Sequence, residues 1–354
     1  MKFFHVSDLH LDSPMTTRLD SAKVRERKNE LLISFKRLTD SAEAKSAQAI
    51  IISGDLFDSE RIGKRTLKNV VEIINAHSKI FFYYLPGNHE RDVLKSSGIT
   101  LPENLFIFGS EWTYFKLNGC NIIGRSDIRS DMFSNIKLAE DEKNILVLHG
   151  ELRDRCDDGY AIGKADLESL PVDYVALGHY HSYSSHKISN RCTAVYCGTP
   201  EPRGFDESAE CGYSEIDLSA TAVGHKFVKS AKRRFHIIEV DISDCESDIA
   251  TLYKLERSIA AASRDDLVRI VLTGALPLGK RIKTDTLASS LQHSFYYVEI
   301  KDETHTKISA DDFKNDISLK GEFIRSVISD GSLTDKEKNA IINLGLEVLY
   351  NDER

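Results

Sequence analysis

The chain lacks the features that mark membrane proteins, disulfide-rich proteins and strongly basic proteins. None of its apolar runs reaches the ~18 residues that a membrane-spanning helix needs. Its six cysteines are scattered without a C-x-x-C pair, so we expect reduced structural thiols rather than a zinc site. The formal net charge is −8, which disfavours a protein that coats nucleic acid through its overall charge. The N-terminus shows no signal-peptide pattern, because His5 and Asp8 interrupt its short apolar stretch. A cytoplasmic location is therefore expected.

Short apolar runs alternate with amphipathic stretches through the first two-thirds of the chain. Runs rich in Ile, Val, Phe, Tyr and Leu predict strands at 2–7, 49–53, 80–85, 144–148, 174–177 and 194–197. Apolar residues three to four apart predict helices at 24–47 and 64–76. Strand–helix–strand alternation of this kind predicts a layered α/β domain.

The pattern changes near residue 215. Further strands are predicted at 212–217, 222–228, 235–241, 267–273 and 296–301, and helices at 247–263, 284–292, 320–328 and 334–350. We therefore divide the chain into a large domain at 1–230, a small α+β accessory domain at 231–303 and a helical C-terminal tail at 304–354.

Five short motifs stand where predicted strands end. They are Asp8-Leu9-His10, Gly54-Asp55-Leu56-Phe57-Asp58, Gly87-Asn88-His89-Glu90, His149-Gly150 and Gly178-His179-Tyr180-His181. Carboxylates and imidazoles held at strand ends are typical ligands of Mn, Fe or Zn. In Asp-x-His and His-x-His both side chains point to one side of an extended chain. The glycines before three of the motifs are expected to let the backbone turn sharply as each strand ends.

Each motif alone has an ordinary structural explanation. Asp-x-His and Gly-Asp often form caps or turns, and a lone His-x-His is often a surface feature. Together, in this order and at successive strand ends, the motifs favour one shared site for two metals. Asp55 is the candidate bridge between the metals, because a carboxylate has two oxygens. Asn88 adds a neutral oxygen.

The ordered set D-x-H, G-D-x-x-D, G-N-H-E, H-G and G-H-x-H resembles that of the calcineurin-like metallophosphoesterases. The resemblance implies that residues 1–230 form the catalytic domain, a sandwich of two mixed β-sheets flanked by helices. It also implies one metal on Asp8, His10, Asp55 and His181, and a second on Asp55, Asn88, His149 and His179. Every one of these positions is filled here.

Three segments are similar to the bacterial SbcD/YhaO group of DNA repair exonucleases, namely 5–14, 54–58 and 267–278. This similarity implies a DNA exonuclease with associated endonuclease activity and Mn as the metal, although the donor set also suits Fe or Zn. It further implies an SbcC-like coiled-coil ATPase as a partner that binds the C-terminal helices, and a homodimer to which helix 64–76 contributes.

The resemblance also assigns chemical roles. The implied reaction is in-line attack on phosphorus by a metal-held hydroxide. His89 matches the catalytic histidine of the family and is expected to protonate or stabilise the leaving oxygen. Asp58 and Glu90 are candidates for orienting His89 or a ligand. Arg203 either grips a substrate phosphate or braces its own loop by pairing with Asp206 or Glu207.

Several alternatives stay open. The same metal site serves a phosphoprotein phosphatase or a small-molecule phosphodiesterase, and the chain can instead act mainly as a subunit of an ATPase assembly. Basic clusters at 232–234, at 279–283 and around Arg61, Lys64, Arg65 and Lys68 are either DNA contacts or solvated surface. The two C-terminal helices, with Ile341, Ile342, Leu344, Leu346, Val348 and Leu349 as an apolar stripe, bind a partner or pack on their own domain.

Overall fold

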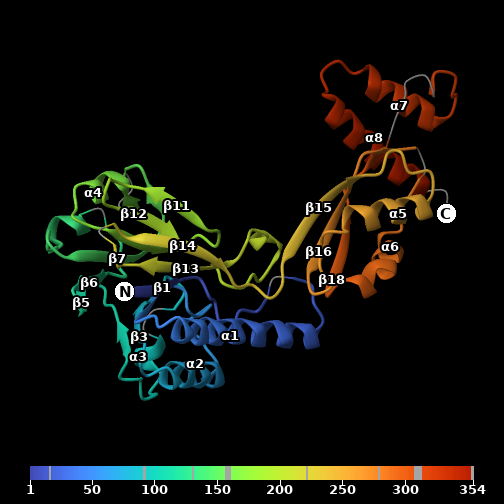
Figure 1. Cartoon of the computed structure of the whole chain (residues 1–354). Coiled ribbons are helices and arrows are strands. Elements are labelled where there is room, and N and C mark those ends of the chain that lie inside the picture. Colours follow the sequence, from blue (N-terminus) through green and yellow to red (C-terminus); the bar gives the residue numbers. More distant parts are fainter. Residues whose placement is uncertain are drawn as a thin grey trace. The chain divides into compact units, whose positions relative to one another are not determined.

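A computed structural model describes residues 1–15, 17–90, 93–129, 131–155, 161–220, 222–277, 280–306 and 313–351 (Figure 1). The chain separates into two compact units, Met1–Phe235 and His236–Arg354. Each unit has its own hydrophobic core. The division into a catalytic domain at 1–230, an accessory domain at 231–303 and a C-terminal tail at 304–354 remains a prediction.

The first unit contains two six-stranded mixed sheets. In spatial order the first sheet consists of β14 (Gly224–Lys229), β13 (Gly212–Asp217), β1 (Lys2–Val6), β2 (Ala49–Ser53), β3 (Phe81–Leu85) and β4 (Leu105–Ile107). The second consists of β11 (Ser184–Lys187), β12 (Thr193–Tyr196), β10 (Tyr174–Gly178), β7 (Lys143–His149), β6 (Cys120–Gly124) and β5 (Thr113–Leu117). β1, β2 and β3 run parallel, as do β7 and β10. The carboxyl ends of parallel strands meet at one edge of a sheet, where ligand sites commonly form.

Helices cover the outer face of each sheet. α1 (Ser21–Ala44) and α2 (Lys64–Ala76) lie along the first sheet (Figure 1), and their apolar residues share a core with those of β1, β2 and β3. A second core fills the space between the sheets. A third lies under α4 (Lys164–Glu168) and the 3₁₀ turn η1 (Met132–Asn135). The predicted sandwich of two mixed sheets flanked by helices is confirmed.

Most predicted elements of this unit have bounds close to those observed, but some strands were not anticipated. β4, β5 and β11 form or extend the edges of the sheets and are only partly buried. β11 has the sequence SSHK, which carries no apolar residue. Edge strands pair through their backbone and need little apolar surface, so the sequence carried no signal for β11. The unit also contains α3 (Val93–Ser96), the 3₁₀ turn η2 (Phe205–Glu207) and a pair of two-residue strands, β8 (Leu152–Arg153) and β9 (Ile162–Gly163).

The second unit is built on a three-stranded sheet of β15 (Phe235–Asp241), β16 (Leu267–Thr273) and β18 (Tyr297–Asp302). Its core is completed by α5 (Asp248–Ser258) and α6 (Thr284–Leu291), the latter followed by the turn η3 (Gln292–Ser294). The short strands β17 (Ala275–Leu276) and β19 (His305–Thr306) pair with each other. The last helices, α7 (Leu319–Ser329) and α8 (Asp335–Asn351), share a small core of their own.

Five of the six cysteines fall within the described ranges, and all five are free and buried. Among the residues described above, no helix combines the length and the apolar character that a bilayer crossing requires. Cys156 lies outside the described residues.

Candidate metal centre

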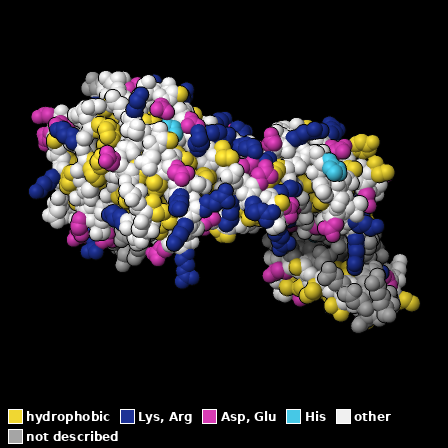
Figure 2. All heavy atoms as spheres, turned by 90° about the horizontal axis from the view of Figure 1, so that it is seen from below, with side chains coloured by type: hydrophobic (Ala, Val, Ile, Leu, Met, Phe, Trp, Pro, Cys, Tyr) yellow, Lys and Arg dark blue, Asp and Glu magenta, His cyan; other side chains and the backbone are white. Residues whose placement is uncertain are grey.

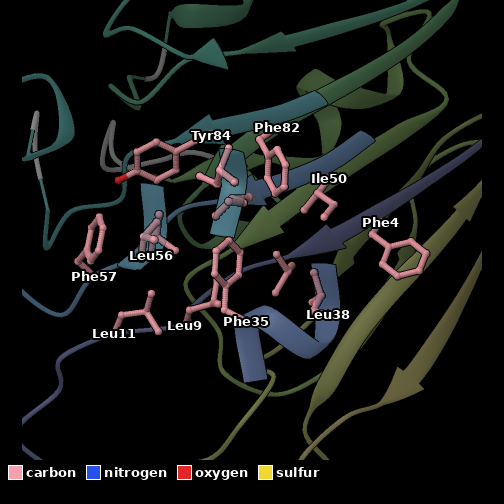
Figure 3. Packing of buried hydrophobic residues seen from close by; sticks show 14 of the residues in the cluster. Phe4, Leu9, Leu11, Phe35, Leu38, Ile50, Leu56, Phe57, Phe82 and Tyr84 are labelled. Carbon is pink, nitrogen blue, oxygen red and sulfur yellow. The ribbon is translucent and has the colours of Figure 1, made fainter. Parts of the chain in front are cut away.

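Two loops that follow β1 and β2 continue the pairing of their strands beyond the sheet. The backbone N–H of His10 donates to the carbonyl of Asp55 over 2.9 Å, and that of Leu11 to Leu56 over 2.9 Å. Along both loops polar and apolar residues fall on opposite sides. Leu9, Leu11, Leu56 and Phe57 point into the core under the first sheet (Figure 3) and are at most 1% exposed. Burial of these four side chains fixes the loops that carry the predicted ligands.

Four of the predicted ligand residues have a left-handed backbone, a conformation that is uncommon for residues other than glycine. The φ angles are 52° at Asp8, 43° at His10, 49° at Asp55 and 108° at His179. Strain of this kind persists only where the surrounding structure imposes it. The paired loops and their buried leucines supply that constraint for the first three residues.

Glycines let these segments approach one another closely. A Cβ on Gly178 would lie 2.0 Å from the carbonyl oxygen of Ser53, and a Cβ on Gly87 would lie 2.0 Å from Oδ1 of Asp55. Only Gly54, with φ of 97°, has the turning backbone that we expected at all three positions. Gly87 and Gly178 are instead needed for the close approach.

The structure brings the predicted ligands into two overlapping groups. One contains Asp8, His10 and His181, and the other Asp8, Asp55 and His149, with the ligand atoms of each group within 4.8 Å of one another. The Nε2 atoms of His10 and His181 lie 3.3 Å apart. This donor set of carboxylates and imidazoles fits first-row divalent cations.

Asp55, the predicted bridge, lies between two of the predicted histidine ligands, while Asp8 is the residue common to both groups. Its Oδ2 lies 3.7 Å from Nε2 of His10 and 3.3 Å from Nε2 of His149, so it faces one histidine of each group. Burial opposes ionisation of Asp55, but its hydrogen bond with His149 and the charge of that ring outweigh burial and lower its pKa to about 2. The same pair raises the pKa of His149 to about 9 against the effect of burial.

Asn88 and His179 lie at the exposed rim of the centre. Oδ1 of Asn88 is 3.0 Å from Nε2 of His149, a position suited to a ligand of the second group. His179 contributes its backbone N–H, which contacts Oδ1 of Asp8 at 3.1 Å, while its ring centroid lies 5.6 Å from that of His149. Its imidazole belongs to neither group of described ligands.

His89 stands beside the ligands without joining them. Its side chain is 48% exposed, and Nε2 lies 3.9 Å from Oδ2 of Asp55. Its ring meets that of His10 edge-on, with centroids 5.3 Å apart. The predicted role of His89 as an acid toward a bound substrate needs this combination of exposure and proximity.

Glu90 does not orient His89, contrary to one of the roles considered for it. Its carboxylate accepts the backbone N–H of Leu56 over 2.8 Å and of Gly87 over 3.3 Å, and also that of Phe57. Burial raises its pKa to about 8, although the backbone donors favour the charged form. Glu90 thus joins the loops that carry the second and third motifs.

Buried polar groups also support the centre from behind. Nδ1 of His149 lies 2.9 Å from the carbonyl oxygen of Ser53, which leaves Nε2 facing the ligands. His5 contacts Oγ of Ser53 at 2.8 Å and the hydroxyl of Tyr174 at 3.0 Å. Burial lowers the pKa of His5 to about 3, so this ring is neutral at physiological pH.

Arg203 is engaged within the protein, which agrees with the bracing alternative. Its guanidinium contacts Glu207 and, through Nη1, Oδ1 of Asp58 at 2.9 Å. Asp58 in turn lies beside the ligand His10 rather than beside His89, with Oδ1 3.1 Å from Nδ1 of His10. Glu207 also contacts His181, at 2.8 Å from Nδ1. The sequence suggested Asp206 or Glu207 as the partner of Arg203, but it carried no signal for the contact of Glu207 with His181.

The basic cluster at 232–234 is not a free surface for DNA. Arg233 is 3% exposed and pairs with Glu30 at 2.8 Å, and Lys232 pairs with the same carboxylate at 2.6 Å. Arg234 lies 3.5 Å from Glu210. In the cluster at 279–283, Gly279 lies outside the described residues and Lys280 donates to the carbonyl of Cys245.

The chain is similar to several known proteins. A model of the calcineurin-like phosphoesterase family matches residues 1–183 of the chain. The uncharacterized metallophosphoesterase YhaO of Bacillus subtilis is 24% identical over 78% of this chain and 72% of its own length. The DNA double-strand break repair protein Mre11 of Sulfolobus acidocaldarius is 22% identical over 97% of this chain and 94% of its own length. A solved dimetal phosphatase from Danio rerio matches 64% of this chain and 95% of its own, with 12% identity and a TM-score of 0.44. Because the family model spans more than half of the sequence and the ligands converge at one edge of the sandwich, the chain belongs to the calcineurin-like phosphoesterase family.

Proposed function

We propose that the protein is a DNA phosphodiesterase that depends on two divalent cations, with exonuclease and associated endonuclease activity. Two ligand groups that share Asp8, with Asp55 lying between His10 and His149, carry the phosphoesterase part of this proposal. The similarity to Mre11 proteins, whose name assigns them to repair of DNA double-strand breaks, supports DNA as the substrate. The cytoplasmic location predicted above would fit that substrate.

The residues of the chain have distinct tasks in this proposal. Two divalent cations, with Mn²⁺ as the expected metal, would supply an activated water and neutralise the charge of the phosphate. Asp8, His10, Asp55, Asn88, His149, His179 and His181 would hold them. His89 would give the proton of its ring to the leaving oxygen, because it is the exposed histidine beside Asp55 that is not itself a ligand.

Basic residues on and beside α1 and α2 support a path for a nucleic-acid backbone. Arg25, Lys28 and Arg65 line one groove together with Asp12, which follows the ligand His10 by two positions. Arg61, Lys64 and Lys68 are exposed nearby in the sequence. Figure 2 shows one face of the molecule, on which Lys and Arg side chains lie among Asp and Glu. Local rather than global positive charge would therefore hold the substrate, and binding should weaken steeply with salt.

The test compares three substrates on one preparation. End-labelled linear duplex DNA, a small phosphodiester and a phosphomonoester are incubated with Mn²⁺, with and without a chelator. We expect chelator-sensitive degradation of the duplex. Turnover of the monoester far above that of the other two would overturn the proposal in favour of a phosphatase, and turnover of the small diester alone would favour a small-molecule phosphodiesterase.

We also propose that α8 binds an SbcC-like coiled-coil ATPase. Ile342 and Leu346 of the predicted stripe face α7 and are buried. Ile341, Leu344 and Val348 are 38%, 66% and 57% exposed and recur at helical spacing. The helices therefore pack on each other while leaving a second apolar stripe for a partner. A homodimer that includes α2 is a further part of the proposal.

A further inference from the structure

Behind the ligands His10 and His181 lies a group of ionic contacts that the proposed reaction does not use. Nη1 of Arg203 donates to Oδ1 of Asp58 over 2.9 Å. Nε and Nη2 of Arg203 donate to Oε1 of Glu207 over 3.0 and 2.6 Å, and the backbone N–H of Arg203 donates to Oε2 over 2.6 Å. One guanidinium therefore connects two carboxylates. We call the group of Asp58, Arg203 and Glu207 the brace.

Each carboxylate of the brace lies against the back of one ligand ring. Oε1 of Glu207 is 2.8 Å from Nδ1 of His181, and Oδ1 of Asp58 is 3.1 Å from Nδ1 of His10. On the opposite side of the rings, the two Nε2 atoms lie 3.3 Å apart. Glu207 thus lies where it can hold the ring of His181, whereas Nδ1 of His10 has no hydrogen-bond partner among the described residues and meets Asp58 only as a neighbouring charge.

We propose that Arg203 and Glu207 are positioning residues for one of the two metals, acting through His181. A neutral imidazole binds a cation through the nitrogen that carries no proton. If Nε2 is the ligand atom, the proton resides on Nδ1 and requires an acceptor. Glu207 is that acceptor for His181, because Arg203, although Nη2 lies 3.2 Å from the same Nδ1, has only donors. Arg203 keeps the two carboxylates in place.

The brace acts at one metal position only. At the other, Nδ1 of His149 faces a neutral acceptor, the backbone carbonyl of Ser53, at 2.9 Å. A carboxylate behind an imidazole fixes its tautomer and makes it a stronger ligand than a neutral acceptor does. The inference rests on the proposed two-metal function. It adds that the two metal sites differ in the acceptor that lies behind a histidine ligand, a carboxylate at one site and a backbone carbonyl at the other. It also replaces the substrate-binding role first considered for Arg203, whose side chain is 13% exposed and already contacts two carboxylates.

The first test measures Mn²⁺ binding to the metal-free full chain by calorimetry. Glu207→Gln and Arg203→Met should each weaken one of the two binding steps by about 10- to 100-fold and leave the other step unchanged. Arg203→Lys should recover part of the loss through its remaining charge. Glu201→Gln is the matched control, because Glu201 is a buried carboxylate on the same loop that pairs with Arg27 at 3.1 Å and touches no ligand. It should keep both steps.

Two results would overturn the brace. One is unchanged Mn²⁺ binding in both variants. The other is an Arg203→Met variant that only raises the KM for a phosphodiester, because that result would indicate that Arg203 binds the substrate.

A second measurement needs no metal. In the metal-free chain labelled with ¹⁵N-histidine, His181 should show the tautomer protonated on Nδ1, and Glu207→Gln should shift the population toward the other tautomer. An unaltered tautomer in that variant would overturn the inference. If the parent chain bound no Mn²⁺ at all, the proposed function would fail, while the tautomer measurement would still decide the role of Glu207.

Discussion

Asp8, His10 and Asp55 combine a left-handed backbone with side chains directed at one place. A left-handed conformation costs roughly 1–2 kcal/mol per residue outside glycine. It persists here because Leu9, Leu11, Leu56 and Phe57 anchor the same loops in the core. The apolar residue after each ligand is therefore as much a part of the site as the ligand.

His89 offers a test of catalysis that is separate from metal binding. Replacing His89 by Ala should leave both Mn²⁺ ions bound, because its half-exposed ring belongs to neither ligand group. Diester turnover should fall by about 10²- to 10⁴-fold, the usual contribution of a general acid. Metal content by mass spectrometry and a steady-state rate on the same sample measure the two effects. A parental rate would show that another group supplies the proton.

Asp55→Ala is the contrasting variant. Because Asp55 faces a histidine of each group, its loss should lower metal content as well as turnover. If this variant still bound two ions, Asp55 would not be the bridge.

At the scale of elements, the centre depends on how closely β10 and β2 approach. Gly178→Ala would place a Cβ 2.0 Å from the carbonyl oxygen of Ser53 and 2.7 Å from Nδ1 of His149. We expect a loss of about 1–3 kcal/mol in the free energy of unfolding, together with weaker Mn²⁺ binding because His149 must move. Urea unfolding followed by the fluorescence of Trp112, the only tryptophan of the chain, reports on this unit.

Gly224→Ala is the matched control for that prediction. A Cβ there meets only Cβ and the carbonyl oxygen of Asp217, at 3.9 and 4.0 Å. Its effect on unfolding should lie within about 0.5 kcal/mol. If both substitutions lowered the free energy of unfolding equally, the close approach at Gly178 would not be the cause of the loss.

The contacts of His5 between β1, β2 and β10 predict a dependence of stability on pH. The folded pKa is lowered to about 3, below the unfolded value of 6.5, so only the unfolded chain takes up this proton between these values. Stability from this group is therefore complete above pH 6.5 and declines as pH falls toward 3. Between about pH 7.5 and about pH 5.5 the parent should lose about 1.4 kcal/mol that a His5→Gln variant does not lose.

Trp112 fluorescence in urea at the two pH values measures this difference. His293→Gln, a change of an exposed histidine in the other unit, should behave as the parent does. A parallel pH dependence of the parent and His5→Gln would show that His5 does not remain neutral in the folded state.

At the scale of the whole molecule, the predicted ligands all belong to the unit Met1–Phe235. Saturation with Mn²⁺ at about 100 times its Kd stabilises the state that binds it by about 2.7 kcal/mol. Hydrogen–deuterium exchange should therefore slow on addition of Mn²⁺ in peptides of the first unit, above all in the loops after β1, β2 and β10. Peptides of the second unit should not change. Asp55→Ala should abolish the effect, and equal protection of both units would contradict the assignment of the ligands to one unit.

The sequence by itself determined the alternation of strands and helices and the position of five motifs at strand ends, and it predicted the five residues that the structure brings into two groups. This was possible because each motif is local, and because the carboxyl ends of parallel strands meet at one edge of a sheet. Tertiary structure alone decided the partners of Glu90, the burial of Arg233 and the link from Arg203 to Asp58, which is 145 residues away. Charged side chains pair with whatever the fold brings within reach, and no local periodicity encodes that choice. For this reason Arg203, a candidate substrate contact in the sequence, is a support for ligands in the structure.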